Sequence, residues 1–407
     1  MPRSERLGPA FDLLGAYRPD GFFLERAGVG LCTWGAVDRV AADGGARRTT
    51  RLADAVADRL AAIGEVPDGP GPVAVGALPF APDVPAHLTV ASHVVSRGDD
   101  GVASRLDLAD KDDAVSSDRW VGRAFPHEAF SAPHVTAVPE PSVYASMIAR
   151  AVERIGDRAL DKVVLARTLT VDANRELDPR QLLQRARSVD PECYAFAAPV
   201  AGGAILVGAS PELLVRKDGP IVSLNPLAGS APRAGDPAAD RRNADGLLAS
   251  DKEREEHGIV VRSLAAALAP LCDDLDVPDE PELLATANVW HLSTRIGGRV
   301  RSDVDSVLRL VDAIHPTAAV GGEPTPAALA TITELEPFDR GCYAGPIGWV
   351  DAAGDGAWAI ALRCAELSGS TARLFAGAGI VAGSDPIQEV EETERKFRAL
   401  LDALRWG

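Results

Sequence analysis

The chain has 407 residues, of which 46% are apolar and 25% are charged, an ordinary composition for a globular protein with a large core. Its net charge of −17, with no cluster of lysines and arginines, makes nucleic acid and anionic membrane surfaces poor partners. No stretch approaches ~18 consecutive apolar residues, and Met1 to Gly15 carry no secretory pattern, so we expect a cytoplasmic protein that does not span a membrane.

The first third of the chain carries few chemical signals. Short apolar stretches at 73–78 and 88–95 predict strands. From about Arg97 to Pro141 the sequence turns acidic and polar, and then rich in proline and serine. Such a composition predicts a long surface connection between an N-terminal lobe and the rest of the chain.

Regular elements become clearer after Pro141. Ser142 suits the N-cap of a helix whose apolar residues recur at helical spacing as far as Ile155. Further helices are expected at 250–271 and from Asp385 onward, because Asp385-Pro386 is a typical helix start. Strands are predicted at 162–171, 193–199, 204–209, 212–224 (a hairpin turning at Asp218-Gly219), 288–300, 343–351, 357–367 and 372–381. Hairpin-joined strands with interspersed helices indicate an α+β fold.

Two pairs of glutamates stand three residues apart on predicted helices, Glu253 with Glu256 and Glu389 with Glu392. Residues at this spacing share a helix face, and Lys396 falls on the same face as Glu389. Carboxylates that face each other from two helices can hold a hard cation such as Mg²⁺. On their own, glutamates at this spacing are more often a solvated helix face than a metal site.

The segment AGAGIVAGSDP precedes the last predicted helix and is rich in glycine. Backbone N–H groups at a helix N-terminus can bind a carboxylate, and small residues let a ligand approach closely. The same residues also fit a tight turn from a strand into a helix.

From about Ser142 onward the sequence resembles the chorismate-utilising enzymes, which include isochorismate synthase, salicylate synthase, anthranilate synthase component I and aminodeoxychorismate synthase. The blocks that carry the resemblance occur in family order: KVVLART, GASPELLVRKDG, NPLAGSAPR, SDKEREEH, NVWHLSTRIGG, HPTAAVGGEP, YAGPIGWVD, ALRCAEL and LFAGAGIVAGSDPIQEVEETERKF. The resemblance implies an anthranilate synthase component I-like α+β fold, with two packed sheets flanked by helices and the site between them. Residues 141–407 would form the chorismate-binding catalytic region, and 1–140 a lobe and connecting segment of the same fold.

The resemblance also implies a set of ligands. Glu256 and Glu392 would be the principal Mg²⁺ ligands, assisted by Glu253 and Glu389, and the metal would hold the ring carboxylate of chorismate. The enolpyruvyl carboxylate would be held by Tyr343, Arg363, Lys396 and the backbone around Gly377 to Gly379, and the ring would be lined by Gly229, Ser230 and His291. These groups would supply the local positive charge that a dianion needs in an acidic protein. Without the resemblance, Arg363 would fit an interior ion pair equally well.

Three further positions bear on the reaction. By resemblance, Lys162 would take a proton from water, and burial near Mg²⁺ and other cations would favour the neutral amine that this role requires. Glu212 would protonate the departing C4 hydroxyl, with its pKa raised by the negative charges of the substrate. Ala228 stands where aminodeoxychorismate synthase has a nucleophilic lysine. We therefore expect neither of the ammonia-using activities nor a glutamine amidotransferase subunit, and we expect a monomer.

Ala319, in HPTAAVGG, bears on the choice between the two water-using enzymes, because salicylate synthases tend to carry threonine there. The resemblance thus implies an isochorismate synthase that adds water at C2 and loses the C4 hydroxyl, supplying a siderophore pathway or else menaquinone. Two alternatives stay open: a salicylate synthase, which also eliminates pyruvate, and a non-catalytic relative that only binds chorismate.

Overall fold

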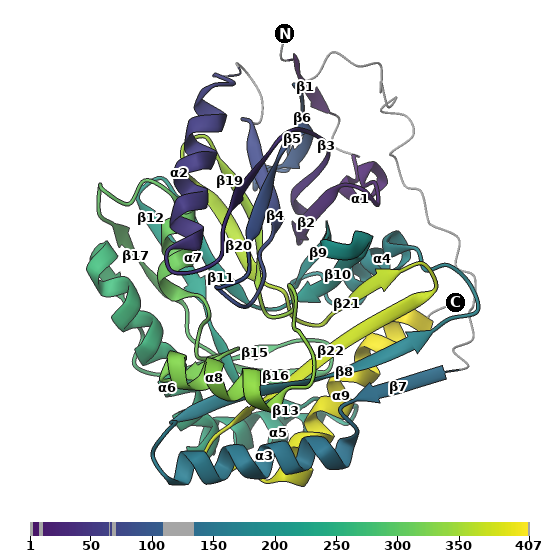
Figure 1. Ribbon diagram of the computed structural model, residues 1–407, viewed down its shortest axis with the longest axis vertical. Coiled ribbons are helices and arrows are strands. Elements are labelled where there is room, and N and C mark those ends of the chain that lie inside the picture. The colour runs from purple at the N-terminus through teal and green to yellow at the C-terminus, as the bar shows by residue number, and fades with distance from the viewer. Residues whose placement is uncertain (1–2, 8–10, 65, 67–70, 109–133, 406–407) are drawn as a thin grey trace.

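Most strands of the chain join one hydrogen-bonded network. The computed structural model describes residues 3–7, 11–64, 66, 71–108 and 134–405. Within these ranges, 19 strands are linked in a large sheet and three more form a small separate sheet, with helices packed around both (Figure 1). The predicted α+β class, with two sheets flanked by helices, is confirmed, although the two sheets are very unequal in size.

The N-terminal part is built mainly of strands. Its helices are α1 (Leu13–Ala16) and α2 (Arg48–Ala61). Its strands are β1 (Arg3–Leu7), β2 (Phe22–Arg26), β3 (Val29–Ala42), β4 (Val73–Ala77), β5 (Ala86–Arg97), β6 (Ala103–Asp107) and β7 (His134–Val138).

The remainder alternates strands and helices. The helices are α3 (Pro141–Gly156), α4 (Pro179–Val189), α5 (Pro237–Ala249), α6 (Asp251–Leu268), α7 (Val307–Ile314), α8 (Thr325–Leu335) and α9 (Pro386–Arg405). The strands of the large sheet are β8 (Lys162–Asp172), β9 (Tyr194–Pro199), β10 (Ile205–Ser210), β11 (Leu213–Asp218), β12 (Ile221–Asn225), β14 (Cys272–Asp276), β17 (Ile296–Val300), β18 (Gly322–Glu323), β19 (Pro346–Asp351), β20 (Gly356–Ile360), β21 (Cys364–Ser368) and β22 (Thr371–Ile380). The small sheet consists of β13 (Leu227–Pro232), β15 (Glu282–Ala285) and β16 (Val289–Ser293).

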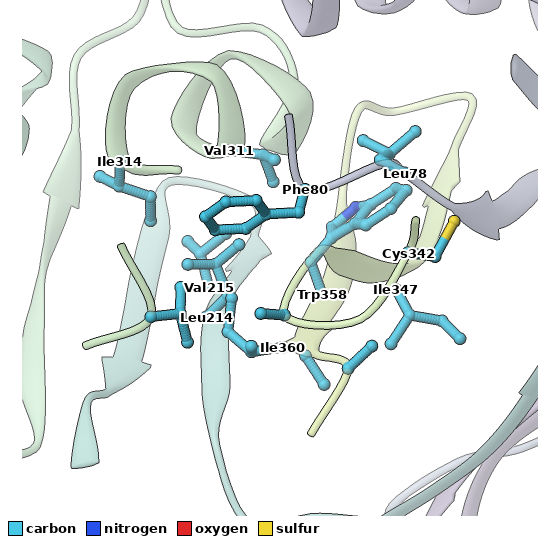
Figure 2. Close-up of a cluster of buried hydrophobic side chains, with 14 of the residues drawn as sticks. Leu78, Phe80, Leu214, Val215, Val311, Ile314, Cys342, Ile347, Trp358 and Ile360 are labelled. Carbon is cyan, nitrogen blue, oxygen red and sulfur yellow. The ribbon is translucent and has the colours of Figure 1, made fainter. Parts of the chain in front are cut away.

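Strand pairing ties the N-terminal part to the rest of the chain. β2 pairs with β9, and β4 pairs with β19, in both cases antiparallel. Side chains continue this connection, because Leu78 and Phe80, just after β4, lie in one apolar cluster with Val215 of β11, Val311 of α7 and Trp358 of β20 (Figure 2). The N-terminal residues therefore share a core with the C-terminal strands.

The longest regular pairing outside the N-terminal part joins β8 to β22, from Val163 opposite Ile380 to Asp172 opposite Thr371. Helix α9 packs on β22 and against α3, and these elements lie in the lower part of the molecule (Figure 1). Two capping residues set the starts of the functional helices: Ser250 Oγ accepts the N–H of Glu253 in α6, and Asp385 Oδ1 accepts the N–H groups of Ile387 and Gln388 in α9. These contacts are the caps that short polar side chains provide.

Several sequence predictions need correction. α3 begins at Pro141, so Ser142 lies in its first turn and not at the N-cap, which is Glu140. The segment expected to be a surface connection contains β6 and β7, while 109–133 fall outside the described residues. The predicted strand 288–300 is two strands, β16 and β17, in different sheets. The predicted strand 357–367 is also two, β20 and β21, interrupted before Cys364.

None of the helices in the described ranges is long and apolar enough to cross a membrane.

Candidate active site

A cavity is bordered by β8 and β22 of the large sheet, by β13 and β16 of the small sheet, and by α6 and α9. Most of the predicted site residues line it: Glu212, Gly229, Ser230, Glu256, His291, Ala319, Tyr343, Arg363, Gly377, Gly379, Glu392 and Lys396. The rest of its lining is apolar: Val164, Pro211, Leu227, Ala228, Val320, Ala344, Leu362, Phe375, Ala376 and Leu400. Three predicted residues, Lys162, Glu253 and Glu389, lie behind this surface.

Lys162 is the first residue of β8, and its side chain has no exposure to solvent. Its Nζ lies 3.0 Å from Glu256 Oε1. Within the described part of the chain this amine makes no hydrogen bond of good angle, so Glu256 compensates its charge without fixing the direction of its N–H groups. Gly379 makes the contact possible, because a Cβ atom there would lie 2.1 Å from Glu256 Oε1 and 3.2 Å from Lys162 Cε. Glycine at this position therefore lets the lysine and the carboxylate meet.

Glu212 lies in the turn between β10 and β11 and is almost fully buried. Its backbone is fixed on both sides, since Ser210 Oγ accepts its N–H and its carbonyl accepts the N–H of Ile360. Burial raises the pKa of its carboxyl to about 8, although Lys162 and the backbone N–H of Leu227 act in the opposite direction. Glu212 is therefore a carboxylic acid at neutral pH. We expected substrate charge to raise this pKa, but in the protein itself burial is enough.

The four glutamates of the two helices face lysines. On α6, Lys252 Nζ donates a hydrogen bond of 3.0 Å to Glu389 Oε1 of α9 and lies 3.5 Å from Glu253 Oε1. On α9, Lys396 Nζ lies 2.7 Å from Glu392 Oε1, one helical turn away. Together with the contact between Lys162 and Glu256, these pairs give every one of the four carboxylates a lysine partner.

The carboxylates also act on one another. Burial raises the pKa of Glu253 and of Glu389, and the negative charges of Glu256 and Glu392 respectively add to this effect. Burial also tends to raise the pKa of Glu392, but Lys396 and Lys252 outweigh it and hold that pKa below its ordinary value. The carboxylates thus form one electrostatic cluster, in which the pKa values of Glu253 and Glu389 are raised and that of Glu392 is lowered.

The cluster fits Mg²⁺ by its chemistry, because carboxylate oxygens are the ligands that this hard cation prefers. Glu256 and Glu392 both line the cavity, and a Cβ atom on Gly229 would lie 3.1 Å from Glu253 Oε2, so glycines make room for these carboxylates. As they stand, however, no three acidic, histidine or cysteine side chains in the described ranges are close enough together to enclose an ion. The lysines hold the carboxylates in pairs instead.

The cavity lining also contains basic side chains, Arg363 and Lys396. Arg363 interrupts β20 and β21 with a positive φ of 47°, and its NH2 lies 2.7 Å from His291 Nε2. Burial and the charges of Arg363 and Lys396 lower the pKa of His291 well below its ordinary value, so the ring is neutral and accepts this hydrogen bond. Lys396 also donates a hydrogen bond of 2.7 Å to the carbonyl of Gly377. The alternative of an interior ion pair for Arg363 is not found among the described residues. Its guanidinium instead donates a hydrogen bond to a neutral ring.

Tyr343 stacks on Phe375, with ring centroids 4.9 Å apart and an interplanar angle of 9°. Burial raises the pKa of its phenol, which therefore stays protonated. Gly377 and Gly379 belong to β22 and pair with β8, whereas Asp385 caps the first N–H groups of α9. Asp385 thus already occupies two N–H groups at the start of α9, whereas Gly377 and Gly379, further back in the glycine-rich segment, line the cavity.

A buried ion pair that the sequence analysis did not single out supports the cavity wall. Arg340 and Glu336 bond through two contacts, 2.8 Å and 2.5 Å long. Arg340 also donates to the carbonyls of Val164 and Val320, and Glu336 accepts the N–H of Ala166. Residues 164–166 lie in β8 between the stretches that pair with β18 and with β7, so the ion pair satisfies backbone groups where a neighbouring strand is missing.

A residue of the N-terminal part, Phe80, contacts this buried ion pair. The guanidinium carbon of Arg340 lies 4.4 Å from the ring centre of Phe80, which belongs to the cluster of Figure 2. A cation over an aromatic face at this distance is attracted by the ring. Phe80 of the N-terminal part therefore contacts Arg340, which in turn is hydrogen-bonded to β8.

Known proteins are similar to this chain over nearly its whole length. Residues 14–405 match the family described as "Chorismate binding enzyme". Isochorismate synthase DhbC of Bacillus subtilis is 38% identical over 404 residues, which cover 96% of this chain and 95% of that protein. A Mycobacterium tuberculosis protein with the provisional name isochorismate synthase MenF is 44% identical over 357 residues, which cover 85% of this chain and 90% of that protein.

Two solved structures are similar to this chain in fold. The crystal structure of DhbC from Bacillus anthracis, provisionally described as a 2,3-dihydroxybenzoate-specific isochorismate synthase, is similar with a TM-score of 0.84 and 35% identity, covering 96% of this chain and 98% of that one. The structure of MenF, the menaquinone-specific isochorismate synthase from Escherichia coli, has a TM-score of 0.82 at 25% identity, covering 99% of this chain and 95% of that one.

Proposed function

This chain belongs to the family of chorismate-binding enzymes, and from that premise we propose that it is an isochorismate synthase, an isomerase that converts chorismate to isochorismate. The observation that carries the proposal is a buried lysine close enough to a buried carboxylic acid to affect its titration: Lys162 lies just behind the cavity, and Glu212, whose pKa is raised to about 8, lines it. The relatives described above, which match at 38% and 44% identity, carry the same activity in their names.

The reaction needs one proton removed and one proton delivered. Lys162 takes a proton from water as the water oxygen bonds to C2 of chorismate, and the ring double bonds shift. Glu212 gives its proton to the C4 oxygen, so the C4 hydroxyl departs as water and the ring gains and loses one oxygen. The role of acid suits the environment of Glu212, because general acid catalysis requires a group that still holds its proton near neutral pH.

The substrate is a dianion, and the cavity lining contains both basic and acidic side chains. We propose that Arg363, Lys396, the Tyr343 hydroxyl and the backbone around Gly377 to Gly379 hold the enolpyruvyl carboxylate. Gly229, Ser230 and the neutral ring of His291 would face the substrate ring. We further propose that Glu256 and Glu392, assisted by Glu253 and Glu389, hold Mg²⁺, which when bound supplies positive charge for the ring carboxylate. The carboxylate donor set and the glycines that make room for it support this assignment.

Two alternatives are separated by particular residues. Ala228 lines the cavity where a covalent, ammonia-dependent mechanism would need a lysine, so no ammonia-supplying subunit is required. Ala319 lines it too, which favours release of isochorismate over the further loss of pyruvate that defines a salicylate synthase. A non-catalytic relative is disfavoured because Lys162, Glu212 and the four glutamates are all present.

For the pathway we propose supply of isochorismate to a siderophore built on 2,3-dihydroxybenzoate or salicylate. The higher identity to the 2,3-dihydroxybenzoate-specific structure, 35% against 25% for the menaquinone-specific one, supports this choice. The Mycobacterium tuberculosis relative shares its name with the menaquinone-specific enzyme, so menaquinone is the competing destination. Deleting the gene and measuring excreted catecholates and salicylate under iron limitation, alongside menaquinone content, separates the two.

One incubation tests the activity. Purified protein is mixed with chorismate and Mg²⁺, and the products are separated chromatographically. Isochorismate alone is the expected result. Salicylate with stoichiometric pyruvate would identify a salicylate synthase, and unchanged chorismate would identify a non-catalytic relative.

A further inference from the structure

Lys252 cross-links the two helices that carry the glutamates. Its Nζ donates to Glu389 Oε1 of α9 at 3.0 Å and lies 3.5 Å from Glu253 Oε1, its neighbour on α6. The side chain of Glu389 is 3% exposed, so this lysine is the charge that lets a carboxylate lie buried between the helices. Lys252 itself is not part of the cavity lining.

The other two lysines of the cluster, Lys162 and Lys396, have a further proposed role or a further contact that Lys252 lacks. Lys162 is the proposed base, and Lys396 contacts Glu392 and the carbonyl of Gly377 in the cavity lining. The direct contacts of Lys252 are with Glu253 and Glu389, which lie behind the lining, so neither proton transfer nor substrate contact accounts for it. Its position is explained by the glutamates alone.

We propose that Lys252 is a positioning residue that holds Glu253 and Glu389 in place across α6 and α9 and, by the same contacts, lowers the affinity of the glutamate cluster for Mg²⁺. This inference rests on the proposed function, which places the cation at these glutamates. Mg²⁺ takes carboxylate oxygens as ligands, and Lys252 already engages one oxygen of each of these two side chains. A fixed positive charge a few ångströms away also repels a dication directly.

Two consequences follow with opposite signs. Without Lys252, the carboxylates repel one another more strongly, so the protein without cation becomes less stable. The same loss makes the cluster more negative, so Mg²⁺ binds more tightly and its binding restores the lost stability. A lysine with a purely structural role would lower stability whether or not the cation is present.

The test compares Lys252→Gln with the wild-type protein in two measurements. Isothermal titration with MgCl₂ gives the Kd, which we expect to fall by on the order of tenfold in the variant. Thermal unfolding in EDTA and in saturating MgCl₂ gives two Tm values, and we expect the variant to lie below wild type in EDTA and to close most of that gap in MgCl₂. Lys252→Arg keeps the charge and should retain the wild-type Kd.

Lys217→Gln is the matched control. Lys217 is likewise a lysine paired with a carboxylate, Asp355 at 2.6 Å, although it is more buried than Lys252, and neither Lys217 nor Asp355 lines the cavity. Its loss should lower Tm by the same amount in EDTA and in MgCl₂, with no change in Kd. If Lys252→Gln behaves like this control, or if its Kd for Mg²⁺ is unchanged or weaker, the inference is wrong. A wild-type protein that gives no Mg²⁺ titration would overturn the proposed metal site, and this inference with it.

Discussion

Glu212 and Glu392 line the same cavity, but their pKa values are shifted in opposite directions. Glu212 belongs to the strand wall, formed by β8, β22 and the turn between β10 and β11, and Glu392 to the helix wall, formed by α6 and α9. On the strand wall, burial raises the pKa of Glu212 to about 8, so this carboxyl is neutral. On the helix wall, burial alone would raise the pKa of Glu392 as well, but Lys396 and Lys252 bring it below the ordinary value. A glutamate is thus a neutral acid at the strand wall (Glu212) and an anion at the helix wall (Glu392), because the charged neighbours of the two residues differ.

The two walls also differ in how they are supported. The strand wall is held by main-chain hydrogen bonds and by the buried pair of Arg340 and Glu336, so its groups have little freedom. The helix wall is held by ion pairs between side chains, with Lys252 joining α6 to α9. Rigid placement suits the proposed proton transfer, whereas exchangeable ion pairs suit the proposed cation site.

Breaking the strand wall should have the largest effect. Lys162→Ala and Glu212→Gln each remove one proton transfer, a role that contributes ~10²- to 10⁴-fold to turnover. We expect losses of that size in kcat, with chorismate still bound because the charged groups that hold it are unchanged. Steady-state rates from chorismate and from isochorismate, with separate binding measurements, provide the check.

The losses should appear in both directions, because one barrier is crossed either way. A Lys162→Ala enzyme with near-normal kcat would remove this lysine from the mechanism and reopen the choice of base. Equal weakening of binding and of kcat would mean instead that the substitution damages the cavity.

Breaking the helix wall should alter the metal requirement more than the chemistry. Glu256→Gln or Glu392→Gln removes one proposed ligand, so half-maximal activity should need at least about tenfold more Mg²⁺, and EDTA should abolish turnover in wild type. The fold should survive, since each change also removes a repelling charge. Activity measured against Mg²⁺ concentration tests this, and full activity of wild type in metal-free buffer would contradict the metal assignment.

The sequence predicted the polar half of the cavity and missed what supports it. Every polar side chain in the lining had been singled out, because chemistry confines such residues to short ordered blocks. Apolar lining residues such as Leu362 and Phe375 cannot be told from core residues by pattern, since a strand buries both kinds. Lys252 stands inside a recognised block, but nothing in that block shows that it reaches the other helix.

The sequence pattern also did not reveal the contacts that distant segments make with the cavity wall. Glu336 and Arg340 stand four residues apart, a spacing typical of an exposed helical pair, but they lie beyond the end of α8 and are buried. Arg363 looked like a residue within a strand, whereas its positive φ breaks that strand and turns the guanidinium to His291. Local patterns do not reveal these features, because their cause is the packing of segments that are far apart in sequence.

The pH dependence sharpens the contrast at Glu212. Its pKa in the folded protein, about 8, is above the ordinary value of 4.5, so its contribution to stability is complete below pH 4.5 and is lost as pH rises through 8. The rate from chorismate should likewise fall above pH 8, by up to about tenfold per unit, because the acid form disappears. Glu212→Gln should flatten the stability difference between pH 5 and pH 9, measured by denaturant unfolding of both proteins. An unchanged slope would show that Glu212 is already ionised at neutral pH.

Ala319→Thr should have the smallest effect, and it tests how finely the strand side of the cavity controls the product. Ala319 lines the cavity, and its N–H donates to Thr317 Oγ1 at 3.2 Å, so the backbone there is already fixed and an added side chain must project into the available space. Threonine adds a methyl and a hydroxyl beside the substrate ring, which should slow isochorismate formation by a few-fold and allow some pyruvate release through a changed orientation of the bound product. Ala319→Val has nearly the same shape without the hydroxyl, so a slower reaction in both variants with pyruvate from the threonine variant alone would assign the new elimination to the hydroxyl. Pyruvate and isochorismate are measured in the same incubation. If the wild-type protein already releases pyruvate and salicylate in equal amounts, the choice of isochorismate synthase over salicylate synthase is wrong, because Ala319 would not then prevent the elimination.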